Sequence, residues 1–534
     1  MSFTPNEQQI AVFNWPKVYS KSLNLIARAG CGKSTTAVEL TKYLTGQVFL
    51  GAFNKAIAVE LQQKVGNRPG VVVGTMHSLG LYHWKRIRSK SKIESRKVHN
   101  LVRPYFPQRE PSQKACASIV RDAVSYAKQS GFGLKGIDYT DSKQWMDLAD
   151  HYDLWDELPK LAVMTDGEGT LGGKMKGDLI PVTKEVLVKV CIEVYDESLE
   201  QCISETDSII DFDDMILAPL YFSDFKASQY DWVLIDEAQD TSETRRRLAQ
   251  WVLKPNGRMV AIGDPAQAIY GFAGATNDAM DLIKKEMHSI ELPLSVTYRC
   301  PKKVVALAQT WVPDITAHES APEGEVTEIN HREFLRTDFK STDVILCRNT
   351  RPLIGIAGVL RKRGIECVVE GVNYQGLIGL VSKWGEEIPI GRMLDSLSEY
   401  TQGEVNRLVE EGKEEKAEQA NEKCQMIWDF SDGLKVTEPV YKLLDKIDRL
   451  LNFSADDREV LRLCTVHRSK GREWDRVFLV GRNLYMPSKW AKQDWELQQE
   501  QNLMYVAVTR SKRALVEVNV PVKPRKDGGP WWEE

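Results

Sequence analysis

The sequence lacks the cysteine spacings that hold metals and the long apolar runs that cross membranes. Its nine cysteines include no Cys-x-x-Cys pair, so neither a zinc nor an iron–sulfur centre is expected. The N-terminal segment carries Glu7 and has no apolar signal core. No uninterrupted apolar run approaches the length of a membrane span. These absences predict a soluble, cytoplasmic protein with reduced thiols and no membrane partner.

The chain also lacks a large excess of charge of either sign. A formal net charge of -4 over 534 residues argues against a uniformly basic coat for nucleic acid, although it permits a local positive groove. The hydrophobic content of 42% can supply sizeable cores, and the length predicts three or four domains. No internal repeat or long low-complexity tract is present. The chain is therefore expected to be a multidomain globular protein.

The segment LIARAGCGKSTT, residues 25–36, has the character of a phosphate-binding loop. Ala27 occupies the first position of the G-x-x-x-x-G-K-[ST] pattern, so the strict pattern is not met. Lys33 could still reach the β and γ phosphates, and the Ser34 hydroxyl could bind Mg²⁺. An apolar strand-like run precedes the loop and helix-like spacing follows it. A glycine-rich turn that binds nothing is the alternative for this segment alone.

A second segment, residues 230–240, reads YDWVLIDEAQD and ends a buried strand with two carboxylates. Ligands of open α/β sheets bind at the carboxyl ends of the strands. Asp236 could hold Mg²⁺, and Glu237 could orient and deprotonate an attacking water. An acidic cap on a core strand is the simpler alternative. Taken with the phosphate loop, the pair favours hydrolysis of a nucleoside triphosphate.

The spacing between these two segments indicates an insertion. Lys33 and Asp236 are 203 residues apart, which exceeds what a compact nucleotide-binding sheet needs. The stretch from about 90 to 205 is polar and contains a glycine-rich run at 166–178, so a largely helical subdomain with a flexible loop is expected. A second stretch, 376–455, includes the charged run 410–423, which is most simply a solvated helix.

Segments along nearly the whole chain resemble the superfamily 1 DNA helicases of the UvrD/Rep-like class, and the wording of two of them is similar to the F-box helicase branch. In family order, the eleven matching segments are NEQQIAV (6–12), ARAGCGKST (27–35), FNKAIAVEL (53–61), GTMHSLG (74–80), IDFDDMI (210–216), LIDEAQDTS (234–242), AIGDPAQAIYGFAGA (261–275), TYRCP (297–301), ILCRNT (345–350), LCTVHRSKGREWDRVFLVG (463–481) and LMYVAVTRSK (503–512). The resemblance implies an α/β chain with two RecA-like parallel-sheet P-loop domains, each carrying an inserted, mostly helical subdomain, with ATP bound between the domains.

The corresponding domain boundaries are expectations of the same resemblance. They are 1–89 with 206–290 for the first RecA-like domain, 90–205 for its helical insert, 291–375 with 456–520 for the second RecA-like domain, 376–455 for a short second insert, and 521–534 for a flexible tail. The second insert is shorter than is usual in the family. The tail could alternatively dock replication or recombination proteins.

The resemblance also assigns roles to individual residues. The implied catalytic residues are Lys33, Asp236, Glu237, Gln267, Arg299 and Arg510. The implied residues for ATP are Gln8, Ala29, Gly30, Cys31, Gly32, Lys33, Ser34, Thr35, Tyr298 and Glu473, with Ser34 and Asp236 also on Mg²⁺. The guanidinium groups would meet the charge that spreads over the transferring phosphoryl oxygens. Without the family, a core role is the better interpretation of Tyr298.

The implied DNA-binding residues combine aromatic and polar side chains: Phe53, Asn54, Thr75, His77, Tyr270, Phe272 and His467. Aromatic faces stack on bases irrespective of sequence. For Phe272 core packing is an equal alternative, because the family usually has Trp-Arg where this chain has Phe272-Ala273. The basic run 84–103 could contact phosphates, although a charge run is more often a solvated face.

The resemblance implies an ATP-dependent DNA helicase, a DNA-stimulated ATPase that moves 3′ to 5′ on single-stranded DNA and at duplex junctions in replication, recombination or repair. A translocase that strips proteins from DNA with little unwinding is an alternative of the same class. A nucleotide-controlled DNA-binding switch is an alternative from another class. Steady DNA-stimulated turnover distinguishes a motor from a switch.

Overall fold

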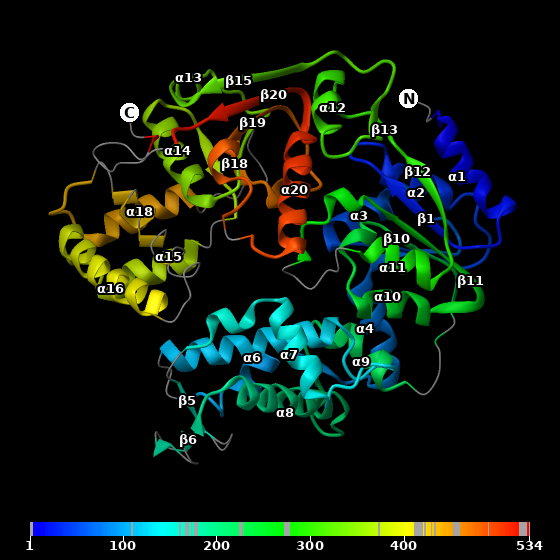
Figure 1. Ribbon diagram of the computed structural model, residues 1–534, viewed down its shortest axis with the longest axis horizontal. Helices are drawn as coiled ribbons and strands as arrows, with labels where there is room; N and C mark the ends of the chain where they lie inside the picture. The colour runs from blue at the N-terminus through cyan, green and yellow to red at the C-terminus, as the bar shows by residue number, and fades with distance from the viewer. Residues whose placement is uncertain are drawn as a thin grey trace. The chain divides into compact units, whose positions relative to one another are not determined.

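In the computed structural model the chain folds into two compact units. Figure 1 shows its helices and strands coloured along the chain. The first unit comprises Met1–Ala27 and Gly32–Leu294, and the second comprises Arg28–Cys31 and Ser295–Glu534. The structure describes residues 4–107, 111–159, 162–165, 170–171, 174–175, 180–223, 227, 229–271, 278–371, 374–410, 420, 423–424, 426–428, 430–431, 434–451, 460–489, 491–522 and 531–532. Within these residues no helix is long and apolar enough to cross a membrane.

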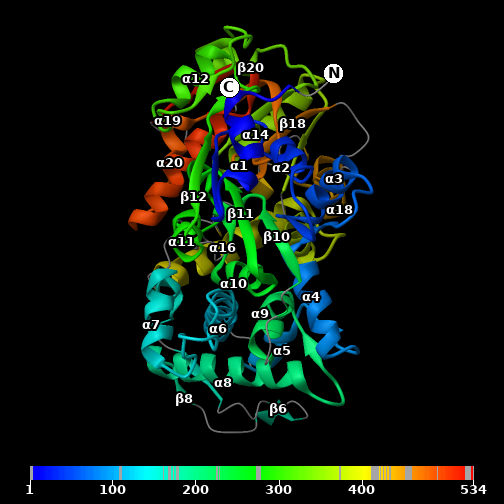
Figure 2. The same ribbon diagram turned by 90° about the vertical axis from the view of Figure 1, so that its right-hand side faces the viewer.

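The first unit is built on a six-stranded parallel sheet. Its order is β12 (Ile290–Leu294), β1 (Leu23–Ala27), β11 (Leu253–Gly263), β10 (Tyr230–Ile235), β2 (Val48–Ala52) and β3 (Val71–Thr75). The neighbouring strands β11 and β10 can be followed side by side in Figure 2. β1 and β10 are almost wholly buried, which is why both read as apolar runs. Their carboxyl ends lead into the phosphate loop and the acidic pair.

The helices around this sheet are α1 (Glu7–Val18), α2 (Lys33–Leu40), α3 (Lys55–Val65), α4 (Met76–Ile87), α9 (Asp214–Tyr221), α10 (Glu243–Trp251) and α11 (Ala279–Glu286). Of these, α1, α3 and α4 begin after a residue whose side chain caps the first turn. Asn6 and Gln9 form a capping box at the start of α1, and Thr75 and Ser78 form one at the start of α4. Two short 3₁₀ helices, η2 (Ala238–Asp240) and η3 (Pro265–Gln267), follow β10 and β11.

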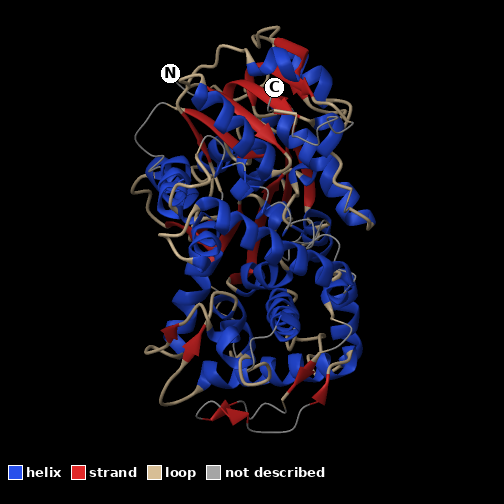
Figure 3. Ribbon diagram, turned by 90° about the vertical axis from the view of Figure 1, so that its left-hand side faces the viewer, coloured by secondary structure: helices blue, strands red, loops and turns tan. Residues whose placement is uncertain are grey.

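Between α4 and β9 (Ile209–Ile210) the first unit is mainly helical (Figure 3). Its elements are β4 (Lys92–Ile93), α5 (Lys97–Val102), α6 (Pro111–Gln129), α7 (Ser142–His151), η1 (Leu154–Glu157), β5 (Val163–Met164), β6 (Thr170–Leu171), β7 (Lys174–Met175), β8 (Ile180–Pro181) and α8 (Lys184–Ile203). The helices share one apolar core.

Inside this helical region lies a buried cluster of two lysines and two aspartates. The Lys97 ammonium is 2.7 Å from Asp214, and the Lys128 ammonium is 2.6 Å from Asp211 and 2.7 Å from Asp214. Buried charges are tolerated when they are paired in this way. The interpretation of the run 84–103 as a surface strip is therefore wrong for Lys97, which is buried.

The second unit repeats the architecture with a different strand order. Its six-stranded parallel sheet runs β15 (Glu325–Asn330), β20 (Ser511–Asn519), β19 (Trp474–Val480), β16 (Asp343–Cys347), β18 (Leu461–Thr465) and β17 (Cys367–Val369). A two-stranded sheet pairs β13 (Val296–Thr297) with β14 (Thr316–Ala317). The prediction of an α/β chain with two parallel-sheet domains is confirmed.

The remaining helices of the second unit are α12 (Lys302–Ala308), α13 (His331–Leu335), α14 (Thr350–Lys362), α15 (Tyr374–Val381), η5 (Ser382–Trp384), α16 (Ile390–Glu410), α18 (Val440–Leu451), η6 (His467–Ser469), α19 (Arg482–Tyr485) and α20 (Asp494–Val508). Residues of α15, α16 and α18 share one apolar core with the sheet. Trp531 and Trp532 belong to the same core, so the prediction of a flexible tail over 521–534 is wrong for this pair. The other proposed domain boundaries stay predictions.

Candidate nucleotide site and nucleic-acid surface

The loop between β1 and α2 has the backbone shape that a phosphate-binding loop requires. Gly32 is the N-cap of α2 and has a φ of 83°, a left-handed conformation that favours glycine. Lys33 and Ser34 follow as the first residues of the helix. The amino end of this helix therefore carries a positive side chain and a hydroxyl next to its unpaired backbone N–H groups.

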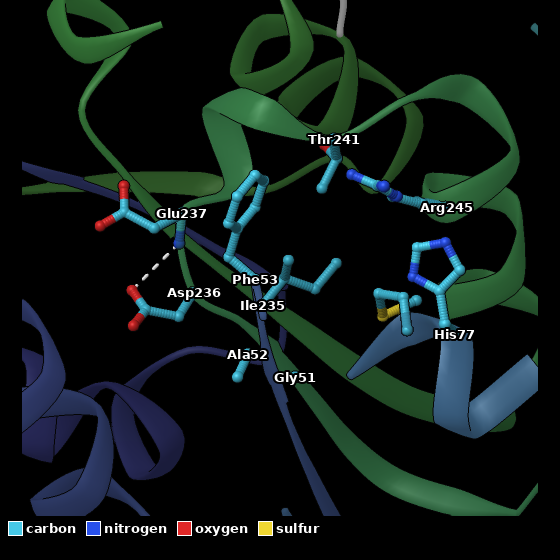
Figure 4. A pocket seen from close by; sticks show the side chains of 10 residues that line it. Gly51, Ala52, Phe53, His77, Ile235, Asp236, Glu237, Thr241 and Arg245 are labelled. Carbon is cyan, nitrogen blue, oxygen red and sulfur yellow. Dashed lines mark hydrogen bonds between the residues drawn. The ribbon is translucent and has the colours of Figure 1, made fainter. Parts of the chain in front are cut away.

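The two carboxylates after β10 face this helix within the first unit. The Lys33 ammonium lies 3.0 and 3.1 Å from the two carboxylate oxygens of Glu237. The Ser34 hydroxyl donates to Asp236 over 3.5 Å, and the Glu237 N–H donates to Asp236 over 3.0 Å (Figure 4). Glu237 has a φ of 52°, an uncommon conformation for a residue with a side chain. The backbone thus turns the two adjacent carboxylates to different positions.

The electrostatics of this group follow from burial and close charges. Burial raises the pKa of Asp236 to about 6, and the neighbouring Glu237 charge adds to that rise, while Lys33 opposes it. For Lys33, burial lowers the pKa, but the charges of Glu237, Asp236 and Asp264 outweigh burial and raise it above its ordinary value. Lys33 is therefore a permanent cation in the site.

A chain of hydrogen bonds connects Glu237 to the segment after β11. The Gln239 amide donates to Glu237 over 2.5 Å, and its carbonyl oxygen accepts the Asp264 N–H over 3.1 Å. The Gln267 amide donates to the Asp264 carboxylate over 2.8 Å. Hydrogen bonds through Asp264 and Gln239 therefore link Gln267 to Glu237. The sequence analysis assigned no role to Asp264 or Gln239.

Ser34 and Asp236 together fit a magnesium ion chemically. Both offer oxygen, which is the ligand type that Mg²⁺ prefers, and they already lie within hydrogen-bonding distance of each other. Within the part of the chain that the structure describes, no group of three or more His, Cys, Asp or Glu side chains could enclose a metal. A site of one carboxylate and one hydroxyl suits an ion that also binds substrate phosphates.

The α1 segment places Gln9 against the phosphate-loop helix. Gln9 is 2% exposed and its amide donates to the Thr36 hydroxyl over 3.0 Å, whereas Gln8 is only half-buried. Thr36 is buried and Thr35 is exposed. The periodicity of α1 could have indicated this, because Gln9 shares the buried face with Val12 and Phe13.

A pocket in the first unit lies next to the acidic pair, on the side of β2 and α4 (Figure 4). It is lined by Gly51, Ala52, Phe53, Met76, His77, Ile235, Asp236, Glu237, Thr241 and Arg245. Burial lowers the pKa of His77 to about 4, and the Arg245 charge contributes to this shift. The imidazole is neutral at physiological pH and can both donate and accept hydrogen bonds. Sequence reasoning missed Arg245.

The predicted DNA-binding residues of the first unit divide into two groups. The rings of Phe53 and Tyr270 are stacked, with centroids 5.6 Å apart and planes 13° apart, and Phe53 is 36% exposed. Asn54 and Thr75 instead accept backbone N–H groups at the starts of α3 and α4. The side chains of Asn54 and Thr75 therefore stabilise the first turns of these helices as N-caps. Phe272 lies outside the described residues.

In the second unit the predicted arginines have distinct surroundings. Arg510 is 1% exposed, and its guanidinium donates to the backbone oxygens of Val506 at 2.9 Å and Arg472 at 3.2 Å. Arg299 pairs with Glu473 over 2.5 Å. Backbone carbonyls orient the first guanidinium, whereas the second is paired with a carboxylate.

Residues Arg28–Cys31, which group with the second unit, bind there through main-chain and charged contacts. The Ala29 N–H donates to the Tyr505 hydroxyl over 3.0 Å, and Arg28 pairs with Asp314 over 2.9 Å. The Tyr298 N–H donates to the Gly30 oxygen over 2.9 Å. Tyr505, buried in α20, was not singled out from the sequence.

A third cluster of the second unit follows β16 and β18. Arg348 donates twice to one oxygen of Glu500, over 2.8 and 2.9 Å, and the other oxygen accepts the Ser488 N–H. Burial lowers the pKa of His467 to about 3, with the charges of Arg348 and Lys470 contributing. His467 is therefore neutral beside two cations.

The structure thus brings together Lys33, Ser34, Asp236 and Glu237, with Gln267 joined through hydrogen bonds, inside the first unit. Tyr298, Arg299, Glu473 and Arg510 lie in the second unit, as do Ala29, Gly30 and Cys31. The assignment of roles to all these residues stays a prediction.

Comparison with known proteins gives a consistent family. A family model described as the UvrD/REP helicase N-terminal domain matches residues 5–288, and one described as the UvrD-like helicase C-terminal domain matches residues 381–518. A probable DNA helicase II homolog of Mycoplasma pneumoniae is 22% identical over 63% of this chain and 61% of its own length. F-box DNA helicase protein 1 of Schizosaccharomyces pombe is 27% identical over 54% of this chain and 34% of its own.

A third relative is matched over most of both chains. The ATP-dependent DNA helicase Rep of Salmonella typhimurium is 19% identical over 91% of this chain and 87% of its own length. The alignments to the first two relatives, in contrast, cover less than two thirds of those proteins.

Proposed function

Because the chain belongs to the UvrD/REP helicase family, we propose that it is an ATP-dependent DNA helicase that travels on single-stranded DNA with 3′ to 5′ polarity. The observation that carries the proposal is the group formed by Lys33, Asp236 and Glu237, in which a permanent cation and two differently oriented carboxylates converge at the end of one parallel sheet. That group suits hydrolysis of a phosphoanhydride.

In the proposed reaction each residue of the first unit has one task. The N–H groups at the start of α2 and the Lys33 ammonium bind the β and γ phosphates. Ser34 and Asp236 would hold Mg²⁺, which would neutralise phosphate charge when bound. Glu237 accepts the proton of the attacking water. Movement of Lys33 from Glu237 to phosphate would free that carboxylate to act as the base.

The second unit supplies cations in this proposal. Arg510 stabilises the negative charge that develops on the phosphoryl oxygens, a role for which its planar, always-charged guanidinium is suited. Its anchoring by main-chain oxygens supports this role, because these oxygens fix the orientation of the guanidinium. Arg299 is paired with Glu473 and would have to exchange that partner for phosphate.

Gln267 is proposed to report the state of the nucleotide site to the DNA surface. It joins Glu237 through Asp264 and Gln239, and it stands three residues before Tyr270, whose ring stacks on Phe53. A base could lie on the exposed part of that aromatic pair. His77 and Arg245 line the neighbouring pocket and would contact the sugar–phosphate chain.

Turnover and unwinding measured on one preparation test the proposal. ATP hydrolysis is expected to rise at least tenfold with single-stranded DNA, and a duplex with a 3′ overhang should be unwound faster than one with a 5′ overhang. Lys33→Ala should abolish both activities and serves as the negative control. Turnover without strand separation would favour a protein-stripping translocase, and slow turnover that DNA does not stimulate would favour a binding switch.

A further inference from the structure

Two tryptophans beyond the last strand are buried in the second unit. Trp531 is 7% exposed and Trp532 is 4% exposed, and both belong to the apolar core that includes α14. Large indole rings bury much apolar surface at a small entropic cost, so they serve as anchors in peptide recognition. Two adjacent tryptophans buried in a domain therefore form a large apolar contact with only two residues.

The place that receives Trp532 is shaped by a glycine in the middle of α14. A Cβ atom on Gly355 would lie 2.0 Å from the indole nitrogen of Trp532 and 2.2 Å from its ring carbon Cε2. Any side chain at this position would therefore collide with the ring. The Arg351 guanidinium, one turn earlier in α14, lies 5.7 Å from the ring centroid.

The glycine requirement is local to this position. Gly358 lies on the same helix, and a Cβ atom there would meet nothing within 4 Å. Glycine inside a helix is destabilising relative to alanine, so a glycine at such a position needs a structural reason such as close packing. At Gly355 the reason is the indole ring of Trp532, which leaves no room for a side chain. Gly358 has no such neighbour and is therefore the matched control position.

Trp531 is recognised by a polar and an aromatic contact. Its indole N–H donates to the Tyr485 hydroxyl over 3.1 Å, and its ring meets the edge of His331 with centroids 6.1 Å apart. The two indoles are packed edge to face at 5.2 Å. The surface thus satisfies the one polar group of an indole and packs against its apolar body.

We propose that His331, Arg351, Gly355 and Tyr485 form a docking site, here called the tryptophan slot, for a peptide segment with two adjacent tryptophans. Its occupant is the chain's own Trp531–Trp532. Because α14 begins at Thr350, two residues after Arg348, an occupied slot also steadies the helix that follows the Arg348–Glu500 pair.

The test uses the full-length chain with Trp531→Ala and Trp532→Ala together, which leaves the slot without its occupant. A fluorescently labelled peptide of residues 523–534 is titrated into this variant and followed by anisotropy. Saturable binding of one peptide per chain is expected, and peptide with alanine at position 532 should bind at least tenfold more weakly. Adding Gly355→Ala to the receptor should weaken binding at least tenfold, whereas adding Gly358→Ala should not.

Absence of saturable binding to a receptor that melts cooperatively would overturn the proposal, as would equal binding by the Gly355→Ala and Gly358→Ala receptors. If the double variant does not fold, the two glycine variants are compared in the otherwise unchanged chain. Gly355→Ala should lower the melting temperature, and Gly358→Ala should leave or raise it; the reverse order contradicts the slot. A parent chain that is dimeric, and that free peptide converts to monomers, would assign the slot to a second copy and overturn the intramolecular occupant.

Discussion

The two units share a six-stranded parallel sheet but carry different chemistry at the ends of their strands. In the first unit β1 leads to Lys33 and β10 leads to Asp236 and Glu237, so cation and carboxylates form one group. In the second unit β16 leads to Arg348 and β18 to His467, and the charge of Arg348 is neutralised by Glu500. The same fold thus carries a lysine–carboxylate group at the ends of its strands in the first unit, and an arginine–glutamate pair with a histidine in the second.

The comparison shows that the two units differ in the residues that follow their strands, although both are built on a six-stranded parallel sheet. The first unit contains an uncommon backbone conformation at Glu237 and buried charges that compete with one another. The second contains cations whose guanidinium groups are held by main-chain or carboxylate oxygens. Variants that remove one charge from each unit can test this division.

The largest effect is expected from Arg510 of the second unit. Arg510→Ala should lower DNA-stimulated turnover by roughly 10³ to 10⁵, or about 4 to 7 kcal/mol of transition-state stabilisation, while nucleotide affinity changes only a few-fold. Arg510→Lys should rescue poorly because an ammonium lacks the planar fork. Turnover and binding of a fluorescent nucleotide are measured together.

The control for this comparison is Arg513→Ala, three residues away on β20. Arg513 is 77% exposed and approaches Asp475 only to 3.8 Å. Its loss should leave turnover within about twofold, as surface ion pairs contribute little. A loss of turnover below tenfold for Arg510→Ala would contradict the assignment of a catalytic cation to the second unit.

The next largest effect is expected from Glu237 of the first unit. Glu237→Gln should lower turnover by about 10² to 10⁴, the range for a general base, and should leave nucleotide affinity unchanged or higher because Lys33 loses a competing carboxylate. Gln239→Ala removes the amide that holds Glu237 and should cost about tenfold. If Glu237→Gln turns over at more than a tenth of the parent rate, another group is the base.

The sequence predicted the sheets and the acidic pair well for a physical reason. Apolar runs such as β1 and β10 are fully buried strands, and glycine at position 32 marks a backbone turn that other residues avoid. The meeting of Lys33 with Glu237 also follows, because parallel strands of one sheet present their carboxyl ends on the same edge.

Other contacts could not be predicted because they depend on packing between distant segments. The basic run 84–103 gave no sign that Lys97 would turn inward to Asp214, 117 residues later. The sequence around Trp531–Trp532 does not show that Trp532 packs closely against Gly355, a residue far earlier in the chain. Asn54 and Thr75 matched a family pattern, yet local geometry uses both as helix caps.

A smaller effect compares the two buried histidines. Burial and nearby cations lower the pKa of His77 to about 4 and that of His467 to about 3. Below about pH 6.5 the unfolded chain therefore binds protons that the folded chain does not, so each histidine lowers stability as the pH falls from 6.5 toward its folded pKa. The loss approaches about 3 kcal/mol for His77 and more for His467.

Urea unfolding at pH 5.0 and 7.5 checks this prediction. His77→Asn and His467→Asn should each reduce the difference in unfolding free energy between the two pH values by a similar amount, roughly 2 kcal/mol, because both folded pKa values lie below 5.0. His151→Asn, in an exposed position of α7, is the control and should leave the difference unchanged. An unaltered pH dependence in both test variants would contradict the prediction. It would mean that each imidazole has the same pKa in the folded and the unfolded chain.

The smallest effect concerns the salt dependence of DNA binding. Lys85 and Arg86 are exposed in α4, whereas Arg88 donates to the Ile203 oxygen and Arg348 is neutralised by Glu500. On single strands each phosphate contact contributes about 0.7 to the slope of log affinity against log salt. Replacing Lys85 and Arg86 by alanine should therefore reduce the slope by about 1.4, while Arg88→Ala and Arg348→Ala should each change it by less than about 0.3.

Lys284→Ala with Lys285→Ala, on α11, is the control for loss of two positive charges from the same unit. A slope that responds equally to both pairs would show a diffuse charge effect, and a larger response to Arg348→Ala would move the main phosphate contacts to the second unit.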